Sequence, residues 1–203
     1  MLVLAVFVSG RGSNFLSIQR AIAEHRLDAR IAVVISNRRD ATALESAAAL
    51  GIPARSFAGV AEAQQVAWMR DTLAEAGVNF IALAGYMKLL PGEIVAAYRH
   101  RITNIHPALL PSFGGTGMYG HHVHEAVLSS GAKVSGATVH LVDEEYDRGQ
   151  IVAQRCVPVL PHDSVESLAA RVLEIEHQIY PEALHLFAED RVEVRGNRTI
   201  ILS

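Results

Sequence analysis

Predicted strands and predicted helices alternate along the first hundred residues of the chain. The strand segments begin with the apolar runs LVLAVFV (2–8) and ARIAVVIS (29–36), and NFIALAG (79–85) and RITNIH (101–106) follow. Continuous apolar runs are typical of strands buried on both faces of a parallel sheet. The segments between them carry a helical repeat of apolar residues, at 14–27, 41–51, 61–77 and 91–100. This alternation predicts an α/β fold, in which helices cover both faces of a mostly parallel sheet.

The pattern changes in the second half of the chain. The elements expected there are a glycine-rich loop, a short helix, two strands, a long helix and a hairpin, at residues 113–120, 121–131, 136–142, 150–159, 164–189 and 191–202. The two strands alternate between apolar and polar residues around a loop, which predicts an antiparallel pair. Pro181 should kink or divide the long helix, and Gly196-Asn197 marks the turn of the hairpin.

Length, charge and cysteine content restrict the class of protein. Half of the 203 residues are hydrophobic, which is enough for one core, so we expect a single domain over 1–203. No stretch reaches the roughly 18 apolar residues of a membrane helix. The first run passes into a glycine-rich turn with no basic segment before it, which predicts a strand rather than a signal peptide. Cys156 is the only cysteine and the net charge is −3 without a basic block, so we expect a cytoplasmic protein without a nucleic-acid partner.

The turn SGRGSN (9–14), between the first strand and the first helix, predicts a phosphate site. Glycines let the backbone approach a ligand closely, and the free N–H groups at a helix start attract an anion. Ser13 or Asn14 could cap the helix instead. A dinucleotide is disfavoured for two reasons. The third glycine of the dinucleotide motif is missing, and the second strand does not end in an acidic residue but runs into the sequence SNRRD. We therefore expect one phosphate rather than a pyrophosphate, and the alternative is a tight turn that binds no ligand.

The stretch NIHPALLP (104–111) is the main candidate for catalysis. Side chains two apart on a strand lie on the same face, so Asn104 and His106 should point together into the crevice at the strand end. Pro107 holds His106 in extended conformation. An amide N–H can donate to a developing oxyanion, and an imidazole can transfer a proton near neutral pH. A carboxylate of the acidic loop 142–150 could reach His106, raise its pKa and fix its tautomer, although such loops are mostly solvated.

Other interpretations of these segments stay open. The histidines of GHHVHEAV, His121, His122 and His124, suggest a metal site, but no cysteine or helical i, i+4 histidine pair accompanies them. Ser13, His106 and Asp147 supply the residue types of a hydrolase triad, but the G-x-S-x-G elbow is missing and the chain order is reversed. The turn AGYMKLLP (84–91) could hold a flat ligand or simply pack in the core.

Five motifs together match a known family. FVSGRGSN, LAGYMKLL, NIHPALLPSFGG, GATVHLVDEEYDRGQIVAQ and EIEHQIYP occur in this order, and the match runs from about residue 2 to residue 187. The chain resembles the folate-dependent phosphoribosylglycinamide formyltransferases, within the formyltransferase superfamily. The resemblance implies their Rossmann-like three-layer α/β/α fold, with a phosphate-binding half (1–100) and a folate-binding and catalytic half (101–203).

The resemblance also implies an activity in purine biosynthesis. The formyl group of 10-formyltetrahydrofolate would pass to the amine of glycinamide ribonucleotide, with no metal and no covalent nucleophile. Asn104 would hold the formyl oxygen, His106 would be the general acid/base and Asp147 would orient and charge His106. The family also implies a cis bond between Leu110 and Pro111. The protein would be a cytoplasmic monomer or homodimer with small-molecule partners only.

The remaining binding residues are implied in the same way. The substrate would be held by Gly12, Ser13, Asn14 and Glu176, and the folate by Met87, Lys88, Leu89, Leu90, Asn104, Val142 and Asp147. The loop 112–124 is longer and richer in glycine than is common in the family, and a basic residue near the folate tail falls near Gln65. Contacts with the folate tail are therefore not carried over to this chain.

Several related functions are alternatives. A methionyl-tRNA formyltransferase would need a further basic C-terminal domain, and a formyltetrahydrofolate hydrolase would carry an N-terminal regulatory domain. A sugar-nucleotide N-formyltransferase is harder to exclude. A non-catalytic nucleotide-binding module would leave the set of Asn104, His106 and Asp147 without a role.

Overall fold

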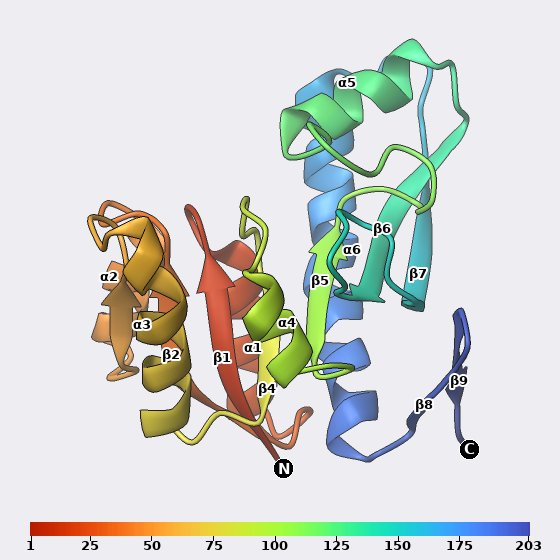
Figure 1. Ribbon diagram of the computed structural model, residues 1–203. Coiled ribbons are helices and arrows are strands. Elements are labelled where there is room, and N and C mark those ends of the chain that lie inside the picture. Colours follow the sequence, from red (N-terminus) through yellow and green to blue (C-terminus); the bar gives the residue numbers. More distant parts are fainter. The chain divides into compact units, whose positions relative to one another are not determined.

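The computed structural model describes residues 1–203, which form two compact units, Met1–Thr103 and Asn104–Ser203. In Figure 1 the first unit is coloured from red to yellow-green and the second from green to blue. The sheet has seven strands in the order β3-β2-β1-β4-β5-β6-β7, and a separate two-stranded sheet pairs β8 with β9. The predicted α/β fold, with a mostly parallel sheet and antiparallel strands toward the C-terminus, is confirmed.

The first unit is built on parallel strands. They are β1 (Leu2–Val8), β2 (Ala29–Ser36), β3 (Ala54–Ser56) and β4 (Phe80–Leu83). β1 lies between β2 and β4 and pairs in parallel with both, and β2 pairs in parallel with β3. Because β1 is central, its residues from Leu4 to Val8 are fully buried, as its continuous apolar sequence predicts.

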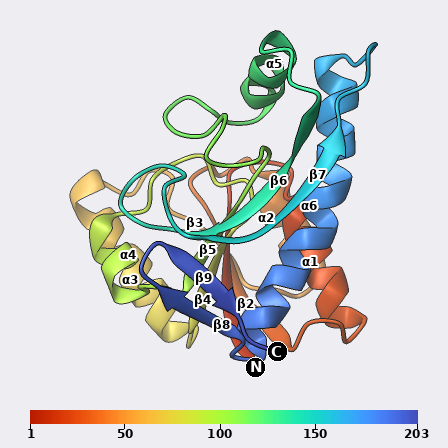
Figure 2. The same ribbon diagram turned by 90° about the vertical axis from the view of Figure 1, so that its right-hand side faces the viewer.

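Helices cover both faces of these strands. They are α1 (Ser13–Ala23), α2 (Thr42–Ala49), α3 (Glu62–Glu75) and α4 (Gly92–Ala97). Figure 2 shows α3 and α4 on one side of the strands of this unit and α1 on the other. The buried side chains of α1 include Phe15, Ile18 and Ala21, whose spacing of three is that of a helix with one face in the core.

The second unit contains the remaining elements. They are the end of β5 (Ile102–His106), α5 (His121–Ser129), β6 (Val134–Leu141), β7 (Ile151–Pro158), α6 (Val165–Ala188), β8 (Val192–Arg195) and β9 (Arg198–Ile201). β6 and β7 are antiparallel, as are β8 and β9 around the turn at Gly196. The helix α6 packs against β6, β7 and α5, as Figure 1 shows.

The predicted side-chain cap of α1 is wrong, and of the two outcomes expected at Pro181, a kink or a division of the helix, the division is wrong. The residue that precedes α1 is Gly12 in left-handed conformation, and no side chain caps the helix, so neither Ser13 nor Asn14 is its cap. Pro181 does not divide α6, which is one helix of 24 residues. Pro181 lies among the buried residues Tyr180, Ala183 and Leu184, and packing of this face compensates for the backbone hydrogen bond that a proline cannot make.

The bond between Leu110 and Pro111 is cis, as the family resemblance implies.

None of the helices is both long enough and apolar enough to be a candidate membrane span.

Candidate active site

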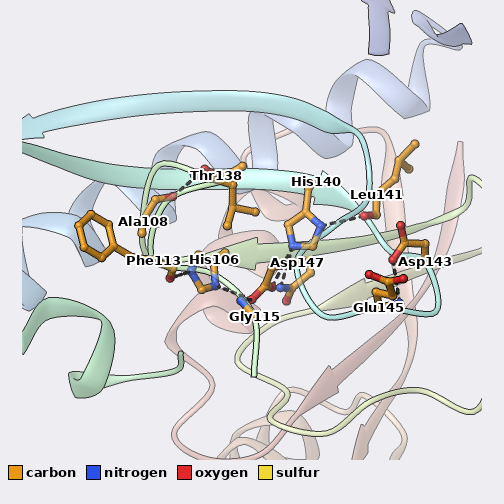
Figure 3. Close-up of polar contacts among 12 residues, drawn as sticks. His106, Ala108, Phe113, Gly115, Thr138, His140, Leu141, Asp143, Glu145 and Asp147 are labelled. Carbon is orange, nitrogen blue, oxygen red and sulfur yellow. Dashed lines mark hydrogen bonds and ion pairs between the residues drawn. The ribbon is translucent and has the colours of Figure 1, made fainter. Parts of the chain in front are cut away.

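His106 and Asp147 lie together in a buried polar cluster of the second unit. His106 is the last residue of β5, and Asp147 belongs to the loop between β6 and β7. His106 Nδ1 is 3.5 Å from Asp147 Oδ2, and the two side chains are only 4% and 9% exposed. Figure 3 shows the imidazole and the carboxylate facing each other. Of the carboxylates in the acidic loop, Asp147 is therefore the one that reaches His106.

The backbone of the glycine-rich loop holds both members of this pair. His106 Nε2 donates to the carbonyl oxygen of Phe113 over 2.8 Å. The N–H of Gly115 donates to Asp147 Oδ2 over 2.9 Å. Phe113 and Asp147 both have a backbone φ of 56°, a conformation that residues other than glycine rarely adopt. Strained backbone of this kind persists where surrounding contacts enforce it, and it is concentrated at functional sites.

Burial is the largest influence on the pKa of His106. Both ring nitrogens face oxygen atoms, which favours the charged ring, but burial is the larger influence and lowers the pKa of His106 below its ordinary 6.5. The sequence predicts that a carboxylate of the acidic loop raises the pKa of His106. Asp147 does act in that direction, but the net shift of the pKa is downward, so the prediction is wrong for the net shift. Burial raises the pKa of Asp147, but its contacts with His140, His106 and the Gly115 N–H together lower it. Near neutral pH the pair consists of a neutral imidazole and a carboxylate.

His140 connects Asn104 to the same cluster. It lies on β6, is 2% exposed, and its Nε2 is 3.1 Å from Asn104 Nδ2. The same Nε2 is 3.5 Å from Asp147 Oδ1. Asn104 and His106, two residues apart on β5, are therefore both linked to Asp147, one through His140 and the other directly.

The turn after β5 is held by Thr138 of β6. The buried Thr138 hydroxyl donates to the Ala108 carbonyl and accepts from the Leu110 N–H. Gln154 of β7 donates to the Leu110 carbonyl over 2.9 Å. These bonds satisfy backbone groups that the prolines of NIHPALLP leave without strand partners, and they keep the end of β5 against β6.

Gly149 has a steric reason to be a glycine. A Cβ atom at this position would overlap the carbonyl oxygen of Leu141, the last residue of β6. The D-x-G pattern of Asp147 and Gly149 thus brings the loop back against the strand end, two residues after the carboxylate.

The turn before α1 has the features expected of an anion site. Gly12 has φ of 77°, and a Cβ at this position would lie 2.5 Å from the Cβ of Ala43 in α2. The residue that precedes α1, Gly12, has no side chain with which to cap the helix, and the start of a helix attracts anions. Asn14 is 6% exposed. Gly12, Ser13 and Asn14 therefore lie together at the start of the helix, in the first unit.

The turn after β4 is tied to the turn after β1. The hydroxyl of Ser9 accepts from the Met87 N–H over 2.9 Å and donates to Asn37 Oδ1 over 2.7 Å. Met87 and Leu89 are 54% and 45% exposed, whereas Leu90 is buried. Lys88 is also exposed. Of the three apolar side chains in this turn that are expected to contact folate, two are thus exposed, and the third, Leu90, belongs to the core.

The other predicted residues lie in the second unit. Glu176 is on α6 and is 7% exposed, and Val142, half-buried, follows β6. Of the three histidines considered for a metal, His122 is exposed and lies 3.4 Å from Glu125. His124 is buried, its Nδ1 has no hydrogen-bond partner, and burial lowers its pKa to about 4. These two neighbouring histidines therefore have very different surroundings.

Sequence reasoning missed His140 and the backbone groups of Phe113 and Gly115. No pattern in the sequence singles out His140, which lies on β6 within the motif GATVHLVDEEYDRGQIVAQ. No sequence pattern predicts which carbonyl or N–H of a glycine-rich loop meets a particular side chain.

Comparison with known families and proteins gives a consistent result. Residues 2–184 match the formyl transferase family model. A chloroplastic phosphoribosylglycinamide formyltransferase from Vigna unguiculata is 47% identical over 93% of this chain, which spans 62% of that protein. A phosphoribosylglycinamide formyltransferase from Haemophilus influenzae is 38% identical over 96% of this chain and 91% of that protein.

Solved structures agree with this match. Glycinamide ribonucleotide transformylase 1 from Symbiobacterium toebii has a TM-score of 0.93 and 42% identity, over 100% of this chain and 95% of that one. A formyltetrahydrofolate deformylase from Pseudomonas syringae has a TM-score of 0.88 and 28% identity, and this chain covers 67% of it. The chain therefore belongs to the formyl transferase family, among its phosphoribosylglycinamide formyltransferases.

Proposed function

We propose that this protein transfers the formyl group of 10-formyltetrahydrofolate to the amine of glycinamide ribonucleotide, a step of purine biosynthesis. The observation that carries the proposal is the cluster in which a carboxamide, two imidazoles and a carboxylate surround the ends of β5 and β6. The names of the curated relatives favour this amine over a sugar nucleotide or methionyl-tRNA.

The chemistry needs an oxyanion donor and a proton carrier. The substrate nitrogen attacks the formyl carbon, and the carbonyl oxygen becomes an oxyanion in a tetrahedral intermediate. The bond from the formyl carbon to N10 of the folate then breaks, the attacking nitrogen loses a proton and N10 gains one. Asn104 Nδ2 would donate to the oxyanion, which stabilises charge where it develops.

His106 would carry the proton. Because its pKa is lowered by burial, the ring is neutral near pH 7 and can accept a proton from the attacking amine. The imidazolium that forms would be stabilised by Asp147, whose carboxylate faces Nδ1. In the structure Nε2 carries the ring proton, which it donates to the Phe113 carbonyl. To accept the amine's proton at Nε2, the ring would have to lose this contact and carry its own proton on Nδ1, toward Asp147.

The other predicted residues would bind the two substrates. The N–H groups at the start of α1, with Gly12, Ser13 and Asn14, would hold the phosphate. Glu176 would contact the sugar or the glycinamide end. The pterin would be contacted by Met87, Lys88, Leu89, Leu90 and Val142. The turn lacks the third glycine of the dinucleotide motif, which favours a single phosphate over a pyrophosphate.

The test is formyl transfer with a panel of acceptors. The purified protein is incubated with 10-formyltetrahydrofolate and glycinamide ribonucleotide, an amino-sugar nucleotide, methionyl-tRNA or no acceptor. We expect formylated glycinamide ribonucleotide and one equivalent of tetrahydrofolate, and little product from the others. Preferential transfer to another amine, or release of formate alone, would reject the proposal.

Single substitutions test the catalytic roles. Asn104→Ala and His106→Ala should each lower turnover by about 10²–10³, because each removes a group that acts on the transition state. Calorimetry should show that a phosphate ligand still binds within a few-fold of the original affinity. His122→Gln, at an exposed position outside the cluster, is the control. Near-normal turnover of His106→Ala would show that its role is misassigned.

A further inference from the structure

The tautomer of His140 follows from its two hydrogen-bond partners. Its Nδ1 lies 2.8 Å from the carbonyl oxygen of the next residue, Leu141. A carbonyl oxygen only accepts, so Nδ1 carries the proton. In the neutral ring Nε2 is then left with a lone pair, and it faces Asn104 Nδ2 at 3.1 Å. Figure 3 shows the ring of His140 between Leu141 and Asp147.

This arrangement decides how the carboxamide of Asn104 is oriented. The two ends of an amide have nearly the same shape but opposite hydrogen-bonding character. An Nε2 that only accepts pairs with the NH₂ end of Asn104 and repels its oxygen. One amide hydrogen is used in this bond, and the second is left to donate elsewhere.

We propose that His140 is a positioning residue that fixes the NH₂ end of Asn104 in the orientation needed to donate to the reaction's oxyanion. This inference rests on the proposed formyl transfer, because Asn104 is the oxyanion donor only in that reaction. Without an acceptor at Nε2, the amide can turn its oxygen toward the developing negative charge. That orientation would repel the intermediate that Asn104 should stabilise.

The surroundings of His140 strengthen its effect on the orientation of the Asn104 amide. The residue is 2% exposed, so a solvent molecule does not readily replace the missing partner of the amide. The carbonyl that holds Nδ1 belongs to Leu141, against which Gly149 is tightly packed. Asp147 Oδ1 lies 3.5 Å from Nε2. It offers the rival state, in which Nε2 is protonated, donates to the carboxylate and no longer accepts from Asn104.

Two substitutions separate the two bonds of His140. In His140→Gln the terminal amide can place an oxygen near the position of Nε2 and accept from Asn104. In His140→Asn the shorter side chain can still donate to the Leu141 carbonyl but supplies no acceptor at that position. We expect His140→Asn to lower turnover by roughly 10–100-fold, since misplacing a reacting group by about 1 Å can cost about 10²-fold. The KM for glycinamide ribonucleotide and the melting temperature should change little, and His140→Gln should restore much of the turnover.

A double-mutant cycle tests whether His140 acts through Asn104. In the Asn104→Ala background, His140→Asn should lower turnover by less than about twofold, because no amide is left to orient. If His140 only supports the fold, its effect should be the same in both backgrounds. Equal effects, or a loss in His140→Gln as large as in His140→Asn, would overturn the proposal.

A measurement without substrate distinguishes this inference from the proposed function. Nitrogen-15 NMR of histidine-labelled protein near neutral pH should show His140 protonated at Nδ1 and unprotonated at Nε2, with Asn104→Ala changing the Nε2 shift. A proton on Nε2 would overturn the inference even in an active formyltransferase. If formyl transfer is absent while Nδ1 carries the proton and the Nε2 shift responds to Asn104, the proposed function fails and the orienting contact stands.

Discussion

At the scale of single residues, the chemistry depends on one carboxylate with several partners. Asp147 is close to His106 and His140 and accepts the Gly115 N–H. These contacts hold the pKa of Asp147 below its ordinary value although burial acts in the opposite direction. Asp147 in turn raises the pKa of His106, without fully offsetting its burial. Removing the charge of Asp147 should therefore have a measurable effect on the titration of His106.

Asp147→Asn should lower the pKa of His106 further below its ordinary value. The carboxylate stabilises the imidazolium and an amide does not, so burial then acts with less opposition. The measurement is an NMR titration of the His106 ring, with Asp143→Asn in the same acidic loop as the control. An unchanged or raised titration midpoint would show that the two groups are not coupled.

At the scale of elements, the candidate phosphate site and the candidate catalytic site each lie at the end of a strand. In each case a glycine allows another segment to approach closely. Gly12 lets the turn after β1 approach α2, and Gly149 lets the loop after β6 return to Leu141. Within each unit, the close approach brings functional groups to the end of a strand.

Gly12→Ala should destabilise the protein by about 2 kcal/mol. The new methyl group would lie 2.5 Å from Ala43 Cβ, and the positive φ of Gly12 is unfavourable for alanine. Chemical denaturation measures the effect. Gly10→Ala is a matched control in the same turn, since its Cβ would meet nothing within 4 Å. Equal stability of the two variants would mean that the turn adapts without cost.

At the scale of the whole molecule, burial of histidines links stability to pH. His124 is 4% exposed, and burial, with His121 and His106 nearby, lowers its pKa from 6.5 to about 4. The unfolded chain therefore binds a proton on this residue at a higher pH than the folded chain does. The stability that its neutral form contributes is complete above pH 6.5 and is lost as the pH falls toward about 4.

His124→Gln should reduce the pH dependence of unfolding in this window. Between pH 6.5 and about 4, the free energy of unfolding of the original protein should fall more steeply than that of the variant. The difference in slope should be at most about 1.4 kcal/mol per pH unit, the value for one proton. His122→Gln, on the exposed side of the same helix, is the matched control. Identical slopes for the original protein and His124→Gln would show that His124 keeps an ordinary pKa in the fold.

The amino-acid sequence by itself determined the strands and the edge at which the functional groups lie. Strand β1 was predicted with its bounds because its apolar run is continuous, and such a run is typical of a strand buried on both faces. The positions of Asn104 and His106 followed from the period of two along a strand. These properties are local, so they can be read from neighbouring residues.

Tertiary structure decided the partners and the net electrostatic balance. His140 joins Asn104 to Asp147 through contacts between segments 36 and 7 residues apart, which no local pattern specifies. The pKa of His106 is lowered although a carboxylate lies beside it, because the cost of burying charge depends on everything packed around the ring. Likewise, α6 continues through Pro181 because its buried face packs against β6 and β7. The physical reason is the same in each case: burial and long-range contact arise only when the chain is folded.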